Sequence, residues 1–344
     1  MNITFLYHGT ENLDRVRDWD PETDAMRFPD GIGHGFFQLY LALRNLHPET
    51  YISSSPDDAD VYVIYKKFKY SFYTNIRIFL RMSLSKKRKR VVSIMSDAPI
   101  YRNHFYFVDK SAVPNYSRIS KKGDRFIPLL PQNGLIPSAK EESGKKVVAV
   151  YGSSQNIPRH ILTDEFVDRC AARGIEFRFA ELDGKSPEKT LDFSDVDITL
   201  CIRGHDELEP GRKPPTKLVN AWVARTVPII DREPGYLSVG SPGRDCLMLD
   251  VDHRQYPSKA QDKLIELIDE ASSDALRGAI AERAAEFTKE NIIKTYLDFF
   301  QVEKASNPTW NYRRMLILSI SIFPVRMLLA RIDRKISRLY KMTR

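Results

Sequence analysis

The chain has 344 residues, of which 42% are hydrophobic and 28% are charged, a composition that excludes a disordered protein. The formal net charge is +8, but residues 310–344 hold nine Lys or Arg and one acid, so the other 309 residues carry no net charge. The basic balance therefore belongs to a tail, and we expect no nucleic-acid partner. The three cysteines are far apart without a CxxC pair, which is typical of reduced thiols in a cytoplasmic protein.

Short β-rich segments alternate with helical or polar ones in the first part of the chain. Residues 3–7 lack a basic region in front of them and predict a first core strand rather than a signal peptide. Residues 36–46 have apolar side chains at helical spacing, and we expect a helix there. Three further strands are expected at residues 61–65, 91–95 and 105–108. This alternation indicates an α/β fold with a parallel sheet and helices on both faces.

A proline-rich stretch at residues 126–138 and a charged segment at 140–146 mark a domain boundary. The α/β pattern then restarts. Strands are expected at residues 147–151, 176–180, 198–202, 227–230 and 246–249, and helices at 217–224, 259–271 and 276–288. We therefore divide the chain into residues 1–140, residues 141–305 and a tail at 306–344.

The tail has the pattern of an amphipathic helix. Its apolar run at residues 315–325 is interrupted by Pro324 and is shorter than the roughly 20 residues that cross a bilayer. Beyond it, apolar residues recur every three or four positions, and cations occupy the neighbouring face: Arg331, Arg334, Lys335, Arg338 and Lys341. This pattern predicts a helix lying on an anionic membrane surface, at the inner face of the plasma membrane. The alternative is a C-terminal helix that docks on the protein's own core.

The segment around Lys217 has the features of an anion site. Two prolines precede Thr216, a candidate N-cap of the helix at 217–224. Free N–H groups at a helix start attract phosphate oxygens. Lys213 and Lys217 add charge there, and Arg203 follows the strand at 198–202. We predict that these groups converge on one anion; the alternative is a solvated basic loop.

Residues 213–236, which include Thr216-Lys-Leu-Val-Asn-Ala and Thr226-Val-Pro-Ile, resemble the donor-binding segment of GT-B glycosyltransferases. The likeness is to bacterial group 1 enzymes of surface-polysaccharide assembly, and the donor motif also resembles that of bacterial α-1,3-fucosyltransferases. Segments 96–101, 127–137 and 150–156 resemble group 1 segments in the same order.

The resemblance implies two Rossmann-like domains facing a cleft, with the nucleotide-sugar donor in the C-terminal domain, the acceptor in the N-terminal one, and neither metal nor cofactor. It assigns Lys217 to the donor diphosphate. The predicted donor site comprises Gly152, Arg203, Lys213, Thr216, Lys217, Asn220, Glu233 and Tyr236. Asn220 stands where many retaining relatives have a second glutamate, and Arg225 stands where glycine is usual.

Candidates for acid–base chemistry lie in the N-terminal half. Gly33 and Gly35 flank His34 at the start of the helix at 36–46, and the pKa of histidine suits a general base. Asp97 follows the strand at 91–95 and can deprotonate an acceptor hydroxyl; each residue can instead be structural. The pair Asp250 and Asp252 resembles a metal-binding DxD only weakly.

We therefore expect a membrane-associated glycosyltransferase that moves a sugar from a nucleotide-sugar to a lipid-linked glycan or polysaccharide acceptor. The alternative is a catalytically inactive protein of the same fold that binds a glycan or a nucleotide-sugar. Asn220 and Arg225 motivate this alternative.

Overall fold

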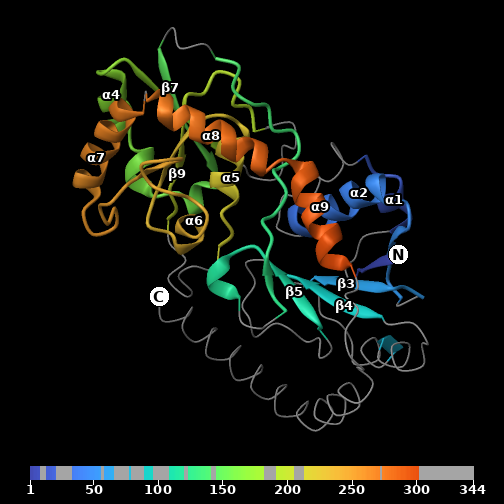
Figure 1. Cartoon of the computed structure of the whole chain (residues 1–344). Helices are drawn as coiled ribbons and strands as arrows, with labels where there is room; N and C mark the ends of the chain where they lie inside the picture. The colour runs from blue at the N-terminus through green and yellow to red at the C-terminus, as the bar shows by residue number, and fades with distance from the viewer. Residues whose placement is uncertain are drawn as a thin grey trace.

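The computed structural model of the protein describes residues 1–7, 13–20, 33–55, 58–65, 77–78, 89–95, 108–119, 123–140, 145–181, 191–204, 213–271 and 273–301. These residues form two parallel β-sheets with helices packed against them (Figure 1). Asp97 and the tail, with Arg331, Arg334, Lys335 and Arg338, lie outside the described residues, as does the side chain of His34.

The first sheet has the order β2-β1-β3-β4-β5-β6 within the described part of the chain. Its strands are β1 (Ile3–Leu6), β2 (Thr50–Ser53), β3 (Val61–Tyr65), β4 (Arg90–Ile94), β5 (Lys110–Val113) and β6 (Arg125–Phe126). The predictions for β1, β3 and β4 are confirmed, and all five residues of β3 are buried, as expected for a strand covered on both faces. A strand was expected at residues 105–108, most of which lie outside the described residues. Val108 itself is not in a strand, and β5 begins two residues later.

Helical segments connect and cover these strands. They are α1 (Leu13–Arg17), the π-helical turn η2 (Gly33–Phe37), α2 (Gln38–Leu46) and the 3₁₀ turn η4 (Tyr116–Arg118). The helix expected at residues 36–46 is therefore present, and it begins earlier, as a π turn at Gly33. Its apolar residues pack inward, because Leu39, Tyr40 and Leu43 are buried.

The second sheet has the order β11-β10-β9-β7-β8. Its strands are β7 (Lys146–Gly152), β8 (Ile175–Glu181), β9 (Ile198–Cys201), β10 (Val227–Ile230) and β11 (Leu247–Met248). All five predicted strands of this half are confirmed. Because β7 pairs with both β8 and β9, the strand order reverses beside it, and the carboxyl end of β7 is a topological switch point.

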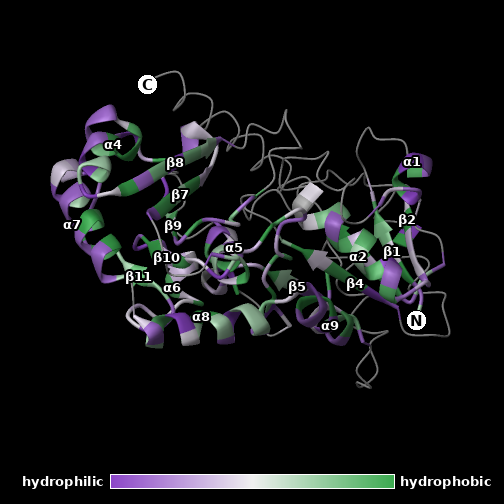
Figure 2. Ribbon diagram, turned by 90° about the horizontal axis from the view of Figure 1, so that it is seen from above, coloured by the Kyte–Doolittle hydropathy of each residue, from purple (hydrophilic) through white to green (hydrophobic). Residues whose placement is uncertain are grey.

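The helices of the second half include the three that the sequence predicts. They are α4 (Asp164–Ala171), α5 (Thr216–Val223), α6 (Pro234–Leu237), α7 (Pro257–Glu270) and α8 (Asp274–Glu286), with 3₁₀ turns η5 (Ser154–Asn156) and η6 (Arg159–Leu162). Helices α4, α5 and α7 bury apolar residues, among them Phe166, Trp222 and Leu264, and Figure 2 shows both hydrophobic and hydrophilic residues along these helices.

The last described helix, α9 (Lys289–Phe300), returns to the first sheet (Figure 1). Arg90 in β4 donates a hydrogen bond from Nη1 to the carbonyl oxygen of Gln301 at 3.0 Å. The ammonium group of Lys110 in β5 lies 4.3 Å from the ring centroid of Phe299. The C-terminal end of the described chain therefore packs against the first sheet, in the N-terminal half.

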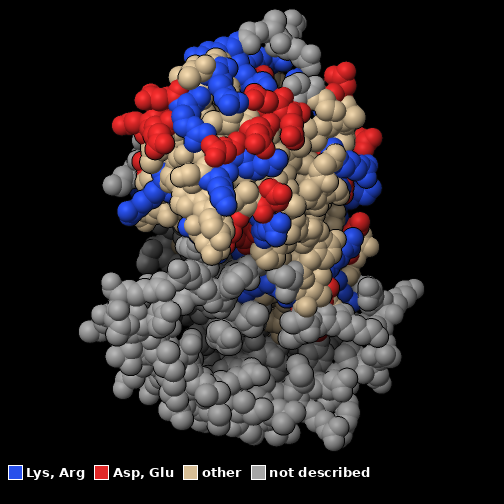
Figure 3. Space-filling model, turned by 90° about the vertical axis from the view of Figure 1, so that its left-hand side faces the viewer, with Lys and Arg blue, Asp and Glu red and all other residues tan. Residues whose placement is uncertain are grey.

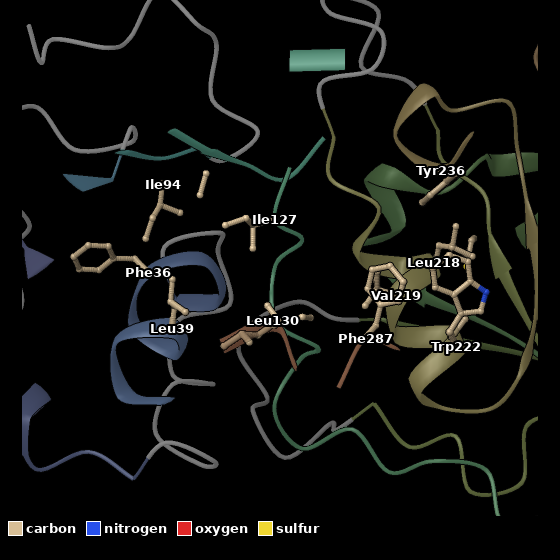
Figure 4. Close-up of a cluster of buried hydrophobic side chains, with 14 of the residues drawn as sticks. Phe36, Leu39, Ile94, Ile127, Leu130, Leu218, Val219, Trp222, Tyr236 and Phe287 are labelled. Atoms are coloured by element: carbon tan, nitrogen blue, oxygen red, sulfur yellow. The ribbon is translucent and has the colours of Figure 1, made fainter. Parts of the chain in front are cut away.

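One hydrophobic cluster runs through both halves of the molecule. In Figure 4, Phe36, Leu39 and Ile94 lie on the N-terminal side, and Leu218 and Trp222 on the C-terminal side. Ile127 and Leu130, from the segment that joins the two sheets, lie between them. The joining segment is therefore packed into the core.

The described surface agrees with the charge distribution seen in the sequence. On the face that Figure 3 shows, basic and acidic side chains alternate over the described residues instead of gathering into a block of one sign. In the same part of the chain, no helix is long and apolar enough to cross a membrane.

Helix α5 ends at a strained residue. Arg225 has φ of +58°, and it is exposed. The N–H of Arg225 donates to Trp222 O at 2.8 Å, and the N–H of Thr226 donates to Ala221 O at 3.0 Å. These two bonds form a Schellman motif, in which glycine is the preferred residue at the left-handed position.

We expect Arg225→Gly to raise the free energy of unfolding by about 0.5–1 kcal/mol, because glycine adopts the left-handed conformation without a steric cost. Urea denaturation measures the change. Arg225→Ala keeps the Cβ atom and should show no comparable gain. Equal stabilisation by both substitutions would attribute the effect to the arginine side chain and not to its backbone.

Candidate functional site

The candidate site lies at the carboxyl edge of the second sheet, at the switch point beside β7. Gly152 ends β7, and Arg203 follows β9 after one residue. Gly152 has φ of +144°, a conformation that favours glycine. A Cβ atom at this position would lie 3.4 Å from Lys217 Nζ, so the missing side chain makes room for the lysine.

Helix α5 points its N-terminus at this edge. The prediction that Thr216 caps the helix is wrong, because Thr216 is the first helical residue and Pro215 occupies the N-cap position. The N-cap side chain makes no hydrogen bond to the helix. The first N–H groups of α5 therefore receive no cap from the N-cap side chain, and the positive end of the helix dipole faces the site.

Lys217 reaches from the first turn of α5 toward the end of β9. Its Nζ atom donates to the carbonyl oxygen of Ile202 at 3.3 Å. Burial, together with the nearby Arg203 guanidinium, lowers the pKa of the Lys217 ammonium group to about 8. The side chain is half-buried and does not extend into bulk solvent.

Arg203 is the second cation of the site. Its Nη2 atom donates to Pro214 O at 2.8 Å, and its guanidinium carbon lies 4.9 Å from the ring centroid of Tyr236. Burial alone would lower the pKa of Arg203, but Tyr236, Glu233 and Asp231 together raise it, so the group stays charged. Its Nη1 atom is buried without a hydrogen-bond partner among the described residues.

Asp231 organises this end of the site, and sequence reasoning missed it. Its Oδ2 atom accepts the backbone N–H of Arg203 at 2.9 Å, and its Oδ1 atom accepts the N–H of Glu233 at 3.1 Å. Its position directly after β10 was the signal that could have found it, because ligand-site residues gather at the carboxyl ends of parallel strands.

Glu233 and Tyr236 stand close to Arg203. Tyr236 is fully buried and offers the face of its ring to the guanidinium. Burial raises the pKa of the Glu233 carboxyl group. Tyr236 Oη and one carboxylate oxygen of Glu233 are buried without a hydrogen-bond partner in the described part of the chain. That these residues contact the ribose or the base of a nucleotide stays a prediction.

Lys213 lies where the two halves of the molecule meet. Its carbonyl oxygen accepts a hydrogen bond from Asn115 Nδ2 at 2.8 Å, and Asn115 follows β5 of the first sheet. Gly235 in α6 is so close that a Cβ atom there would lie 2.5 Å from the same carbonyl oxygen. The backbone of Lys213 is therefore a tightly packed joint.

Asn220 lies one turn after Thr216 in α5 and faces the segment that joins the sheets. Its Oδ1 atom accepts the backbone N–H of Gln132 at 3.2 Å, and its Nδ2 atom donates to Gln132 Oε1 at 2.6 Å. The sequence contained no signal for this pair, because a glutamine in a proline-rich segment has no characteristic spacing.

A cavity of about 190 Å³ adjoins these groups. It is lined by Gln132, Tyr151, Gly152, Leu191, Phe193, Thr199, Leu200, Thr216, Lys217 and Asn220. Its polar groups come from α5, from Gln132 and from two hydroxyl groups on the strand side. The hydroxyl groups on the strand side are already bonded, because Tyr151 donates to Asp192 O and Thr199 pairs with Thr226. The free hydrogen-bonding capacity of the cavity therefore lies beside Lys217.

The predicted acceptor side lies at the start of α2. Gly33 and Gly35 belong to the π turn, and a Cβ atom at Gly35 would lie 2.9 Å from Tyr65 Oη. Packing against Tyr65 therefore accounts for this glycine. The role of His34, whose backbone is in the same turn, and that of Asp97 stay predictions.

A scan against models of known protein families finds no match to this chain, and neither does a search of curated proteins. Solved structures do match. A glycosyltransferase from Rickettsia africae ESF-5 superimposes with a TM-score of 0.50 at 9% identity, over 87% of this chain and 97% of that one. The chain has the GT-B fold.

Two other solved structures are similar to the chain. AviGT4, a glycosyltransferase involved in avilamycin A biosynthesis, has a TM-score of 0.49 at 11% identity, over 87% of this chain and 96% of its own. TarM has a TM-score of 0.44 at 10% identity, and the alignment spans 58% of its length. The two parallel sheets and the match to the Rickettsia structure confirm the expected architecture of two Rossmann-like domains. Lys217 and Arg203 lie at the carboxyl edge of the second sheet, the edge at which open α/β sheets bind ligands.

Proposed function

We propose that the protein is a glycosyltransferase that binds the diphosphate of a nucleotide-sugar donor at Lys217, Arg203 and the N-terminus of α5. One observation carries the proposal. Lys217 Nζ bonds to the carbonyl oxygen of Ile202, the residue directly before Arg203, so the two cations are neighbours. Asp231 and Glu233 act on Arg203 electrostatically, but neither cation forms an ion pair with a carboxylate within 4 Å among the described residues. Two neighbouring positive charges repel each other, and a bound anion with two phosphates relieves that repulsion.

The same arrangement suits sugar transfer. As the bond between the sugar and the diphosphate breaks, negative charge grows on the leaving diphosphate. Fixed cations and the positive end of a helix dipole stabilise that charge more in the transition state than in the ground state. The proton of the attacking hydroxyl then passes to a base, for which His34 and Asp97 are the candidates.

The test is binding and turnover by the purified protein. UDP-, GDP- and dTDP-sugars, which carry a diphosphate, are screened for thermal stabilisation, and the nucleotide-sugar that stabilises most is assayed for hydrolysis and transfer. Failure of every nucleotide to raise the melting temperature would refute the proposed function. His34→Ala and Asp97→Asn should preserve donor binding, and the one that removes transfer identifies the base.

Binding should depend on pH through Lys217. The anion binds the charged lysine, whose pKa in the free protein is about 8, so affinity should fall as pH rises above that value, by up to about tenfold per unit. Calorimetry with the nucleotide-sugar that stabilises the wild type most, from about pH 7 to about pH 9, measures this fall. The diphosphate of a nucleotide-sugar is esterified at both ends, so its own charge does not change in this range.

Lys217→Arg is the control for this titration, because a guanidinium keeps its charge throughout the range. Its affinity should stay nearly constant with pH. An equal fall in the wild type and in Lys217→Arg would place the titrating group elsewhere.

Binding without transfer is the second candidate function. The observation that favours it is the pairing of Asn220 with Gln132, at the position where many retaining relatives have a glutamate. Saturable donor binding with no turnover against lipid-linked or polysaccharide acceptors would select this candidate over the enzyme.

The acceptor and the membrane partner are proposals from the sequence. We propose that the cationic tail at residues 306–344 binds anionic lipid and brings the site near a lipid-linked acceptor. Co-flotation with vesicles containing phosphatidylserine should fall with added salt. A chain ending near residue 307 that floats equally well would refute the anchor.

A further inference from the structure

The chemistry of the Asn220–Gln132 pair determines which end of each amide faces which partner. The backbone N–H of Gln132 can only donate, so the Asn220 atom that it contacts must be the oxygen. The amide nitrogen of Asn220 then faces the Gln132 side chain and can only donate, so the atom that receives it must be Gln132 Oε1. The orientation of both amides therefore follows from the hydrogen bonds themselves.

This leaves the Nε2 group of Gln132 as the free end of its amide. Gln132 lines the cavity together with Lys217, and its Nε2 makes no hydrogen bond with the part of the chain that the structure describes. It adds two neutral donors to a site whose other donors include the Lys217 ammonium group, the Thr216 hydroxyl group and the N–H groups of α5.

The backbone on either side of Gln132 is held from the first sheet's side. Gln38 in α2 donates from its buried Nε2 atom to Pro131 O at 2.5 Å and to Asn133 Oδ1 at 2.7 Å. Gln132 is thus fixed between a helix of each half, and its side chain is pre-organised before a ligand arrives.

We propose that Gln132 is a further ligand-binding residue, whose Nε2 group donates to an oxygen of the nucleotide-sugar in the cavity, and that Asn220 is the positioning residue that orients it. The proposal rests on the proposed function, since the ligand is the same donor. It gives Asn220 a role through Gln132, in place of the direct contact that the sequence predicted.

A double-mutant cycle tests the proposal. The variants are Gln132→Leu, Asn220→Leu and the two combined, and calorimetry measures the dissociation constant of the nucleotide-sugar that stabilises the wild type most. Each single substitution should weaken binding about 5- to 10-fold, the worth of one hydrogen bond. Because Asn220 acts through Gln132, adding Asn220→Leu to Gln132→Leu should change the constant less than about twofold.

Two further variants distinguish a lost contact with the ligand from a general folding defect. Gln132→Glu still accepts the hydrogen bond from Asn220 but presents an anionic oxygen to the cavity, so it should weaken binding more than Gln132→Leu does. Gln261→Leu, which removes an amide that donates to His160 O in the second half, should leave the constant unchanged.

The outcomes separate the two proposals. If the wild type binds and Gln132→Leu binds equally well, the role of Gln132 is refuted while the proposed function stands. If the two single effects add in the double variant, Asn220 does not act through Gln132. If the wild type binds none of the nucleotide-sugars, the proposed function fails and this proposal fails with it.

Discussion

Lys217→Met should unfold at a higher temperature than the wild type and yet lose about 100-fold in affinity for the nucleotide-sugar. The lysine is charged in a half-buried position beside Arg203, and its lowered pKa of about 8 measures the cost of that charge to the folded state. Methionine fills similar space without a charge. Only the hydrogen bond to Ile202 O, worth about 1 kcal/mol, is lost in exchange.

The net gain in the free energy of unfolding should be about 1–2 kcal/mol, which raises the melting temperature by about 2–4 °C. The sign follows from the pKa values. The unfolded lysine has a pKa of about 10.4, whereas that of the folded one is about 8. Below about pH 8 the lysine is therefore charged in both states, and burial of this charge lowers the free energy of unfolding by its full amount. Between these two values the folded lysine loses its proton first, and the advantage of methionine fades.

Lys146→Met is the matched control. Lys146 Nζ also donates to a backbone carbonyl, that of Ile268 at 2.8 Å, but it lies at the start of β7, away from the site. This variant should bind the nucleotide-sugar as the wild type does. A Lys217→Met protein that melts lower than the wild type and binds normally would contradict both the buried charge and its role.

Gly235→Ala should disrupt the joint between the two halves of the molecule. The added Cβ atom would lie 2.5 Å from Lys213 O and 3.0 Å from Asn115 Nδ2, the two atoms that share the hydrogen bond across this joint. Backbone must move to relieve such a contact, and we expect a loss of about 1–3 kcal/mol in the free energy of unfolding.

Movement of the Lys213 backbone should also displace Arg203. The carbonyl that moves precedes Pro214, whose own carbonyl oxygen accepts a hydrogen bond from Arg203 Nη2. We therefore expect Gly235→Ala to weaken nucleotide-sugar binding about tenfold as well, measured by calorimetry below the melting temperature.

Gly278→Ala provides the comparison for this substitution. Gly278 lies in α8, and no atom of the described residues is within 4 Å of a Cβ atom built there. Alanine in a helix interior should stabilise the protein by about 0.5–1 kcal/mol and leave binding unchanged. Gly235→Ala with wild-type stability would show that residues 213–215 shift freely and that the joint is not tight.

The elements that the sequence predicted correctly are those with continuous apolar runs. The five residues of β3 and the four of β10 are all buried, so their hydrophobic character was visible without the fold. Strand β5 reads Lys-Ser-Ala-Val, and β2 and β6 are short and partly exposed. Pairing with neighbouring strands makes these segments extended, and a local pattern cannot contain that information.

The cations of the candidate site were predictable for the same local reason. Lys217 follows two prolines at the start of a helix, and Arg203 follows a strand, so each carried a signal within a few residues. Asp231 had a comparable signal that went unused. Gln132 and Asn115 had none, because each contributes through a contact made across about 90 or more residues of chain.

The sequence by itself determined the class of fold and the chemistry available to it: alternating strands and helices, a helix start rich in cations, and a basic tail. The tertiary structure decided which of those groups meet. Parallel pairing of β7, β9 and β10 aligns their carboxyl ends, which brings Gly152, Arg203 and Asp231 to one edge. Packing of the joining segment against α5 then adds Gln132. A sequence pattern reflects neighbours along the chain, and it can therefore predict a helix or a strand. The site depends on distances between residues that are far apart in the sequence, and only the packing of the folded core sets those distances.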